Sequence, residues 1–270
     1  MTRSGTPSTT RRALVGALPC LAILAGCATP SMPPAGARAA LAPTGELRVA
    51  LIAGSPMSLV ATAPVEEMRG VSVDLGRSLA GRLGVPVKFV VYPRLPDSLA
   101  AVRRGDADLI ITNATPERAA TLDFASTLVD LELGVLVPPT PRITSIDGID
   151  QSGFVIGVSQ GSTSERTLGG RFRLSKVRGF PSLAAAREAL ITMQVDGFAT
   201  NKAVLHELGE RVPGSRVLEG RWGTEHFAAA LPKGRDAAGL AYLRMFTDEV
   251  RRNGELQRAA DRAGLKGMVK

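Results

Sequence analysis

The stretch DLIITNATPER, residues 108–118, decides how this chain folds and where its chemistry lies. Its first four residues predict a buried strand that gives way at once to a helix. Thr115 fits the helix N-cap, Pro116 the first helical position and Glu117 the first turn. Arg118 then places a permanent positive charge where unpaired amides already favour anions. Without further context, a solvated arginine or a structural salt-bridge donor is the simpler interpretation.

Short apolar runs alternate with amphipathic stretches along the chain, which predicts an α/β architecture rather than a sandwich or a bundle. The expected strands cover residues 47–53, 87–92, 108–111, 131–137, 154–158, 197–200 and 227–231. The expected helices cover residues 73–83, 97–104, 162–171, 182–193 and 201–208, and a last helix ends at 253–254. Gly84 and Gly105 are expected to stop the first two helices.

Six short motifs follow one another in order: RGVSVDL (69–75), RGDADLI (104–110), TPER (115–118), LDFA (122–125), VIGVSQGSTSE (155–165) and VDGFAT (195–200). Each motif alone is weak. The ordered set, from about Gly45 to Leu265, resembles the bacterial extracellular solute-binding proteins of family 3. The resemblance implies a two-lobe type II periplasmic-binding-protein fold. Each lobe would be a mixed β-sheet flanked by helices, and two crossing strands would join the lobes around a ligand cleft.

The predicted organisation follows from that resemblance and from the N-terminal pattern. Residues 1–26 are expected to be a lipoprotein signal peptide and residues 27–43 a flexible tether. Residues 44–130 would form the first lobe, residues 131–227 the second, and residues 228–270 would return to the first.

The N-terminus has the features of a secretion signal. Arg11 and Arg12 precede an apolar run over residues 13–25 that is too short to span a bilayer as a stable helix. The run ends in LAGC, which resembles a lipobox and makes Cys27 the expected lipid-bearing first residue of the mature chain. An ordinary secretory peptide and a buried core segment are the alternatives, and the arginine pair also allows twin-arginine export. The expected location is the periplasm or cell envelope.

Composition narrows the class of protein further. Both cysteines, Cys20 and Cys27, lie at or before the expected processing site, so the mature domain can form no disulfide framework. Removal of the leader would leave 30 of the 33 basic residues against 25 acidic ones, a balance of +5. Because the basic residues are scattered and aromatics make up only 4% of the chain, nucleic acid is not an expected partner.

The resemblance assigns roles to three residues around the cleft. Arg118 would form a bidentate pair with a ligand carboxylate. Asn113 stands where the family has a Ser or Thr that contacts the same carboxylate. Thr163 would offer its amide and hydroxyl from the second lobe. Ser162 is a further ligand candidate, but the pattern Ser162 to Glu165 is also a capping box, and helix capping is its more expected role.

Two departures from the family bear on the ligand. Asn201, followed by Lys202, stands where the family has an Asp that recognises an α-amino group, although Asn201 also suits a helix N-cap. Met57 and its neighbours replace a frequent first-lobe aromatic, and Met57 can still pad a pocket. These departures favour a ligand dominated by negative charge, such as an organic acid, over a standard amino acid.

The sequence therefore predicts the receptor lipoprotein of an ABC-type importer, with a membrane permease as partner and a small anionic or zwitterionic solute as ligand. No cofactor, metal or catalytic group is expected, because the two histidines, His206 and His226, lie on different elements without ligand spacing. Two alternatives stay open: an accessory or sensory protein, for instance of a periplasmic dehydrogenase, and a cleft enzyme of the cyclic dehydratase type.

Overall fold

The computed structural model describes residues 1–2, 5, 33–60, 64 and 67–269, and the chain from Met32 onward forms one unit. Cys27 and nearly all of the predicted signal peptide lie outside the described residues. Within the described part of the chain, no helix has both the length and the apolar character needed to cross a membrane.

The unit alternates helices and strands, as expected from the sequence. The strands are β1 (Leu47–Ile52), β2 (Val87–Tyr92), β3 (Ile110–Asn113), β4 (Leu122–Val137), β5 (Val155–Ser159), β6 (Lys176–Phe180), β7 (Gly197–Asn201), β8 (Arg216–Val217) and β9 (Gly223–Pro232). The helices are α1 (Ala35–Leu41), α2 (Val71–Leu83), α3 (Leu95–Arg104), α4 (Pro116–Ala119), the short 3-10 helix η2 (Ile146–Gly148), α5 (Thr163–Arg171), α6 (Leu183–Ile191), α7 (Lys202–Gly209), α8 (Ala237–Arg252) and α9 (Glu255–Arg262).

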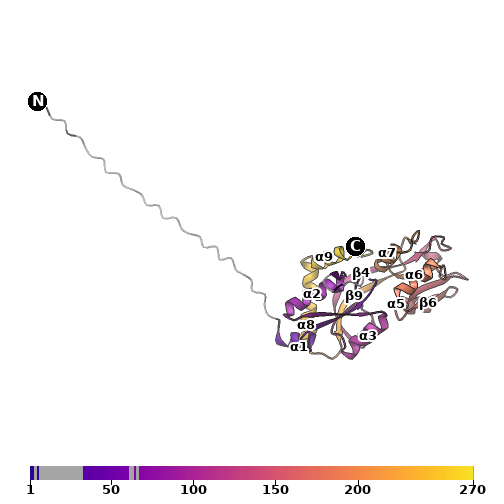
Figure 1. Cartoon of the computed structure of the whole chain (residues 1–270), viewed down its shortest axis with the longest axis horizontal. Helices are drawn as coiled ribbons and strands as arrows, with labels where there is room; N and C mark the ends of the chain where they lie inside the picture. Colours follow the sequence, from indigo (N-terminus) through magenta and orange to yellow (C-terminus); the bar gives the residue numbers. More distant parts are fainter. Residues whose placement is uncertain (3–4, 6–32, 61–63, 65–66, 270) are drawn as a thin grey trace. The chain divides into compact units, whose positions relative to one another are not determined.

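Two lobes share the long antiparallel pair β4 and β9, which runs from one lobe into the other. In the first lobe β3 pairs with β9, and a single bridge from Val49 to Leu109 connects it to the parallel pair of β1 and β2. In the second lobe β7 pairs with β4 and continues to β5 and β6. Helices α1, α2, α3, α8 and α9 surround one lobe, and α5, α6 and α7 surround the other (Figure 1). The lobe boundaries placed at 131 and 228 fall inside the two crossing strands.

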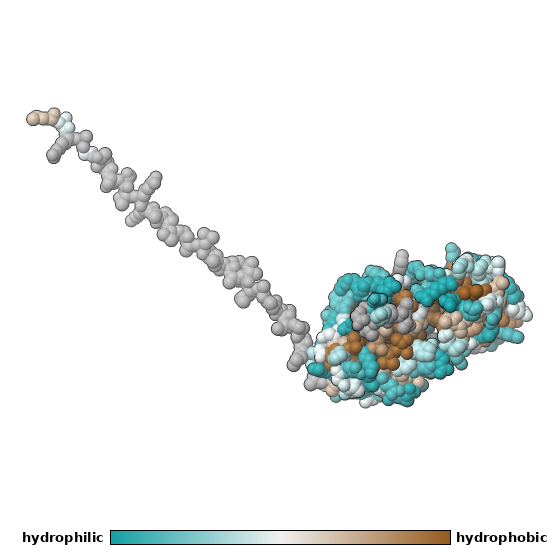
Figure 2. Space-filling view, in the orientation of Figure 1, coloured by the Kyte–Doolittle hydropathy of each residue, from teal (hydrophilic) through white to brown (hydrophobic). Residues whose placement is uncertain are grey.

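Each lobe has its own hydrophobic core. In the first lobe, apolar side chains of α2, α8 and β1 gather in the largest cluster, and a smaller one lies beneath α3. In the second lobe, one cluster lies on each face of the sheet, around Ile156 and around Phe198. The visible surface of the folded part mixes hydrophilic residues with smaller hydrophobic patches (Figure 2). The division of the core leaves the crossing strands as the main covalent and hydrogen-bonded connection between the lobes.

Helix α1 corrects the prediction of a tether that extends to residue 43. Its Ala37 and Leu41 are fully buried, and the helix packs against α8. The close approach requires Gly239, since a Cβ there would lie 2.5 Å from the Cβ of Ala40. Alanine-rich sequence favours helix, and a partner surface supplies the burial that a short helix needs. Residues 35–41 are therefore a packed helix and not part of a flexible tether.

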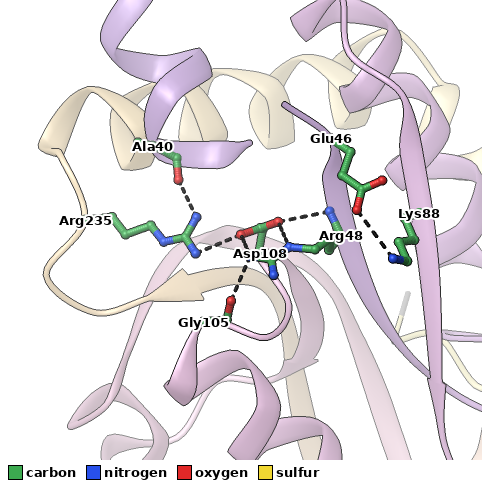
Figure 3. Close-up of polar contacts among 7 residues, drawn as sticks. All are labelled: Ala40, Glu46, Arg48, Lys88, Gly105, Asp108 and Arg235. Carbon is green, nitrogen blue, oxygen red and sulfur yellow. Dashed lines mark hydrogen bonds and ion pairs between the residues drawn. The ribbon is translucent and has the colours of Figure 1, made fainter. Parts of the chain in front are cut away.

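The buried carboxylate of Asp108 lies at the centre of a hydrogen-bond network that connects several segments of the first lobe. Arg48 donates to its two oxygens through Nε and Nη2, both at 2.8 Å, and Arg235 donates through Nη2, also at 2.8 Å (Figure 3). Arg235 also donates to the carbonyl of Ala40, the next-to-last residue of α1. The side chain of Asp108 is 0% exposed, so its charge is balanced entirely by protein groups. This network joins the RGDADLI motif to β1, α1 and the loop before α8.

Candidate functional site

A cleft between the lobes brings together all six residues that the sequence suggests for ligand binding. Its walls come from the ends of β1, β3, β5 and β7, from the helix starts that follow them, and from β9. The predicted residues on its lining are Met57, Asn113, Arg118, Ser162, Thr163 and Asn201. Clefts at the ends of strands and between lobes are the usual place for small ligands. Their joint position supports the site, while their individual ligand contacts stay predictions.

Arg118 is a buried charge whose protein partners are neutral. Thr115 caps α4 through its side chain, as predicted, but α4 is a single turn, so the guanidinium supplies most of the positive potential. Its Nη1 donates to the Thr112 hydroxyl at 2.9 Å and to the Asn113 carbonyl at 3.0 Å. Among the described residues, no carboxylate forms an ion pair with it. Burial lowers the pKa of Arg118, which nonetheless stays charged.

Glu225, which is not among the site residues predicted from the sequence, lies on the same lining. It belongs to β9 and is 6% exposed. Its Oε1 accepts from Asn113 Nδ2 at 3.4 Å, and its Oε2 accepts from Asn201 Nδ2 at 3.1 Å. Burial raises the pKa of Glu225, opposed by these bonds and by the positive charge of Arg118. Arg118 and Glu225 form no ion pair with each other, so the cleft contains two buried, opposite charges held apart.

The two asparagines have fixed orientations. Asn201 Oδ1 accepts from the amide of Val204 at 3.1 Å and thereby caps α7, the structural role weighed for it from the sequence. Asn113 Oδ1 accepts from the amide of His226 at 2.9 Å. Both side chains must then direct Nδ2 elsewhere, and both direct it to Glu225. Asn113 and Asn201 are therefore parts of the site that hold a carboxylate of the protein.

Direct contacts cross the cleft beside these charges. Asn113 Nδ2 donates to Thr163 Oγ1 at 3.2 Å, and Arg166 of the second lobe forms an ion pair with Glu117 of the first at 2.8 Å. Gly161 permits the approach, because its φ is +72° and a Cβ would lie 2.5 Å from Pro96. The lobes therefore touch at the rim of the cleft.

Ser162 performs the capping role expected of it. Its hydroxyl accepts from the amide of Glu165 at 3.1 Å, while the Glu165 carboxylate accepts from the amide of Gly161 at 2.6 Å. The capping box is therefore shifted by one residue on its acidic side, because the amide of Ser162 already donates to the carbonyl of Ser159 at 3.1 Å.

Apolar side chains line the rest of the cleft. Met57 is 1% exposed and lines the first-lobe side of the cleft, at the place where the sequence predicted a methionine instead of an aromatic. Phe180 at the end of β6 and Phe227 on β9 also line the cleft. Neither aromatic was among the site residues predicted from the sequence. Among the described residues, no group of three or more His, Cys, Asp and Glu side chains could hold a metal ion.

The sequence model of the bacterial extracellular solute-binding proteins, family 3, matches residues 47–265. The chain belongs to this family. Membership confirms the resemblance found in the ordered motifs, and the structure has the two-lobe type II fold of periplasmic binding proteins that the resemblance implied. Membership of a family of extracellular proteins also indicates a location outside the cytoplasm.

Proteins similar to this chain are named as binding proteins or receptors. The glutamine-binding protein of an ABC transporter of Bacillus subtilis is 23% identical over 63% of this chain, and the match spans 64% of that protein's length. A probable histidine-binding protein of Neisseria gonorrhoeae is 27% identical over 70% of this chain and 72% of its own. The solved receptor for L-cysteine of Neisseria gonorrhoeae is 24% identical, covers 87% of this chain and 100% of its own, and superposes with a TM-score of 0.75.

Lys202, which follows Asn201 in the sequence, does not bring its positive charge to the cleft. It is the first residue of α7 and is absent from the cleft lining. Its Nζ instead pairs with Glu132 at 2.5 Å. The charge that does face the cleft from this side is the negative charge of Glu225.

A local signal for Glu225 existed in the sequence. Alternation along a strand puts Glu225 and Phe227 on one face and His226 on the other. An acidic residue that precedes Phe227 and three alanines in one apolar strand is unusual and favours a functional position. The signal becomes specific only once β9 is known to cross the cleft.

Proposed function

We propose that this protein is the substrate-binding receptor of an ABC-type importer that captures a small carboxylate-bearing solute in the cleft and delivers it to a membrane permease. The observation that carries the proposal is Arg118, buried on the cleft lining with only neutral partners among the described residues. A buried guanidinium needs a counter-charge, and a carboxylate fits its planar fork. Family membership and the names of the relatives support the same reading.

A ligand screen with an arginine variant tests this function. Thermal unfolding would be followed with each standard amino acid and with its deaminated acid. A ligand at about 100 times its dissociation constant adds about 2.7 kcal/mol of stability. Arg118→Ala should weaken binding of every ligand found by roughly 2–5 kcal/mol in calorimetry, with the fold retained by circular dichroism. Arg118→Lys should restore little, because an ammonium lacks the bidentate fork. Unchanged affinity in Arg118→Ala would refute the assignment.

We also propose that the mature chain is anchored by acyl groups on Cys27, from the LAGC pattern and the Pro-rich and Ala-rich residues after it. The described structure begins its first helix at Ala35, so the anchoring segment would be shorter than the predicted tether. Mass spectrometry of the native N-terminus should find a diacylated or triacylated cysteine. A mature N-terminus beyond Cys27 would exclude the anchor.

A cleft enzyme is a second candidate because of Glu225. A buried carboxyl group with a raised pKa beside a guanidinium resembles a general acid in its environment. Its two asparagine donors argue against that role, because hydrogen bonds to the carboxylate oxygens favour the ionised form over the protonated form that a general acid needs. Recovery of the bound ligand unchanged after long incubation supports binding alone, and chemical conversion supports the enzyme.

A further inference from the structure

We propose that Glu225 on the crossing strand β9, and not the residue at position 201, supplies the carboxylate that recognises an ammonium group of the ligand in this cleft. The inference rests on the proposed binding function and names a specificity-determining residue of the same site. It reverses the expectation from the sequence. Because Asn201 stands where the family has an Asp, the sequence predicted that the cleft lacks a carboxylate for an amine. In this chain the carboxylate is present, but a neighbouring strand, β9, supplies it.

Charge balance in the closed cleft is the first argument. Arg118 and Glu225 are 7% and 6% exposed, and neither forms an ion pair within the described residues. Isolated buried charges are costly unless they are paired. A simple anion would compensate Arg118 and leave Glu225 facing a second negative charge. A ligand with one carboxylate and one ammonium compensates both.

The hydrogen bonds around Glu225 are the second argument. Asn113 and Asn201 each use Oδ1 to accept from a backbone amide, which leaves Nδ2 as the atom presented to Glu225. Each carboxylate oxygen therefore faces one donor. An ionised carboxylate only accepts, so this pair of donors is suited to the charged form. The asparagines position Glu225, while Glu225 itself would contact the ligand.

The exchange of amide and acid between two positions is the third argument. The resemblance implies an Asp at position 201, where this chain has Asn201. Asn201 Nδ2 lies 3.1 Å from Glu225 Oε2, so the carboxylate of Glu225 is adjacent to that position. A carboxylate at both positions would bring like charges into contact. A neutral residue at position 201 therefore avoids repulsion with Glu225. The absence of a carboxylate at position 201 does not mean that the cleft cannot recognise an amine.

A charge exchange between these two residues tests the inference. Three proteins are compared with the wild type: Glu225→Gln, Asn201→Asp, and the double variant Asn201→Asp with Glu225→Gln. The double variant keeps the number of heavy atoms and the net charge and only exchanges amide and acid. Calorimetry measures L-glutamine against glutaramate, L-histidine against imidazolepropionate and L-cysteine against mercaptopropionate. Each pair differs by the ammonium alone, and the remaining standard amino acids are paired in the same way.

The wild type should bind at least one amino acid more tightly than its deaminated acid. Glu225→Gln should reduce that preference by about tenfold to a hundredfold, because a charge-assisted hydrogen bond is lost. Asn201→Asp alone should give no gain, since it adds a like charge beside Glu225. The double variant should recover most of the preference, which a merely structural role of Glu225 would not produce.

Failure of the inference differs from failure of the proposed function. If the deaminated acids bind the wild type as tightly as the amino acids, or if Glu225→Gln keeps the full preference, Glu225 does not recognise an ammonium although anion capture stands. If neither member of any pair binds or stabilises the wild type, the binding function itself falls, and the inference with it.

Discussion

Asp108 and Glu225 are both buried carboxylates, yet the protein surrounds them in opposite ways. Two arginines donate to Asp108, so its charge is balanced within the fold (Figure 3). Glu225 accepts hydrogen bonds from two side-chain amides and forms no ion pair among the described residues, although a buried guanidinium lines the same cleft. The first arrangement stabilises the ligand-free protein. The second leaves Glu225 without an ion-pair partner among the described residues, and a ligand can supply one. A binding site gains affinity in this way at the expense of stability.

The comparison also explains why the two sites lie where they do. Asp108 accepts from Arg48 of β1 and from Arg235 in the loop before α8, and Arg48 also donates to the Gly105 carbonyl at the end of α3, all within one lobe. Glu225 lies on a strand shared by both lobes and contacts one residue from each, Asn113 and Asn201. Charge compensation at Asp108 therefore holds one lobe together. Compensation at Glu225 by a ligand would favour the state in which both lobes enclose it.

The largest expected effect comes from breaking the balanced site. Asp108→Asn leaves Arg48 and Arg235 without their shared counter-charge, so unfolding should become easier by about 3–5 kcal/mol. Chemical denaturation measures the change, and Asp106→Asn is the matched control. Asp106 pairs with Arg104 on the surface, with exposures of 54% and 63%, so its loss should change stability by about 0.5 kcal/mol or less. Equal changes in unfolding free energy for the two variants would mean that Asp108 contributes no more to stability than an exposed ion pair does.

Local signals in the sequence were sufficient for much of the fold. Gly84 and Gly105 end their helices in the left-handed conformation, as expected, because a glycine after an amphipathic run is a strong local stop. The caps at Thr115, Ser162 and Asn201 also lie at their predicted helix starts. Each of these features depends on a few neighbouring residues, which is the information that a single sequence carries.

Elements that depend on distant partners escaped prediction. Strand β6 reads KVRGF, and its mixture of charges and glycine shows no clear alternation; it is a strand because it pairs with β5 at the sheet edge. The sequence predicts part of a tether where helix α1 lies, because the burial of α1 against α8 depends on residues far along the chain. Glu225 escaped for the same reason, since its burial and its asparagine partners come from three separate parts of the chain.

Thermal unfolding of ligand-free wild-type protein and Glu225→Gln, compared across pH, tests most directly whether the charge of Glu225 is balanced by a ligand or by the fold. Burial raises the pKa of Glu225 in the folded state, where it faces Arg118, Asn113 and Asn201, so the fold holds the proton more tightly than the unfolded chain does. The contribution of the protonated group to stability is complete below the unfolded pKa and is lost as pH rises through the folded pKa.

Glu225→Gln, which cannot ionise, should therefore match the wild type in acid and exceed it at higher pH, by about 1 kcal/mol or more. The gap should close or reverse when an amino acid that binds the wild type is added. A variant that is less stable than the ligand-free wild type at neutral pH would contradict the account, because Glu225 would then be a structural carboxylate of the same kind as Asp108.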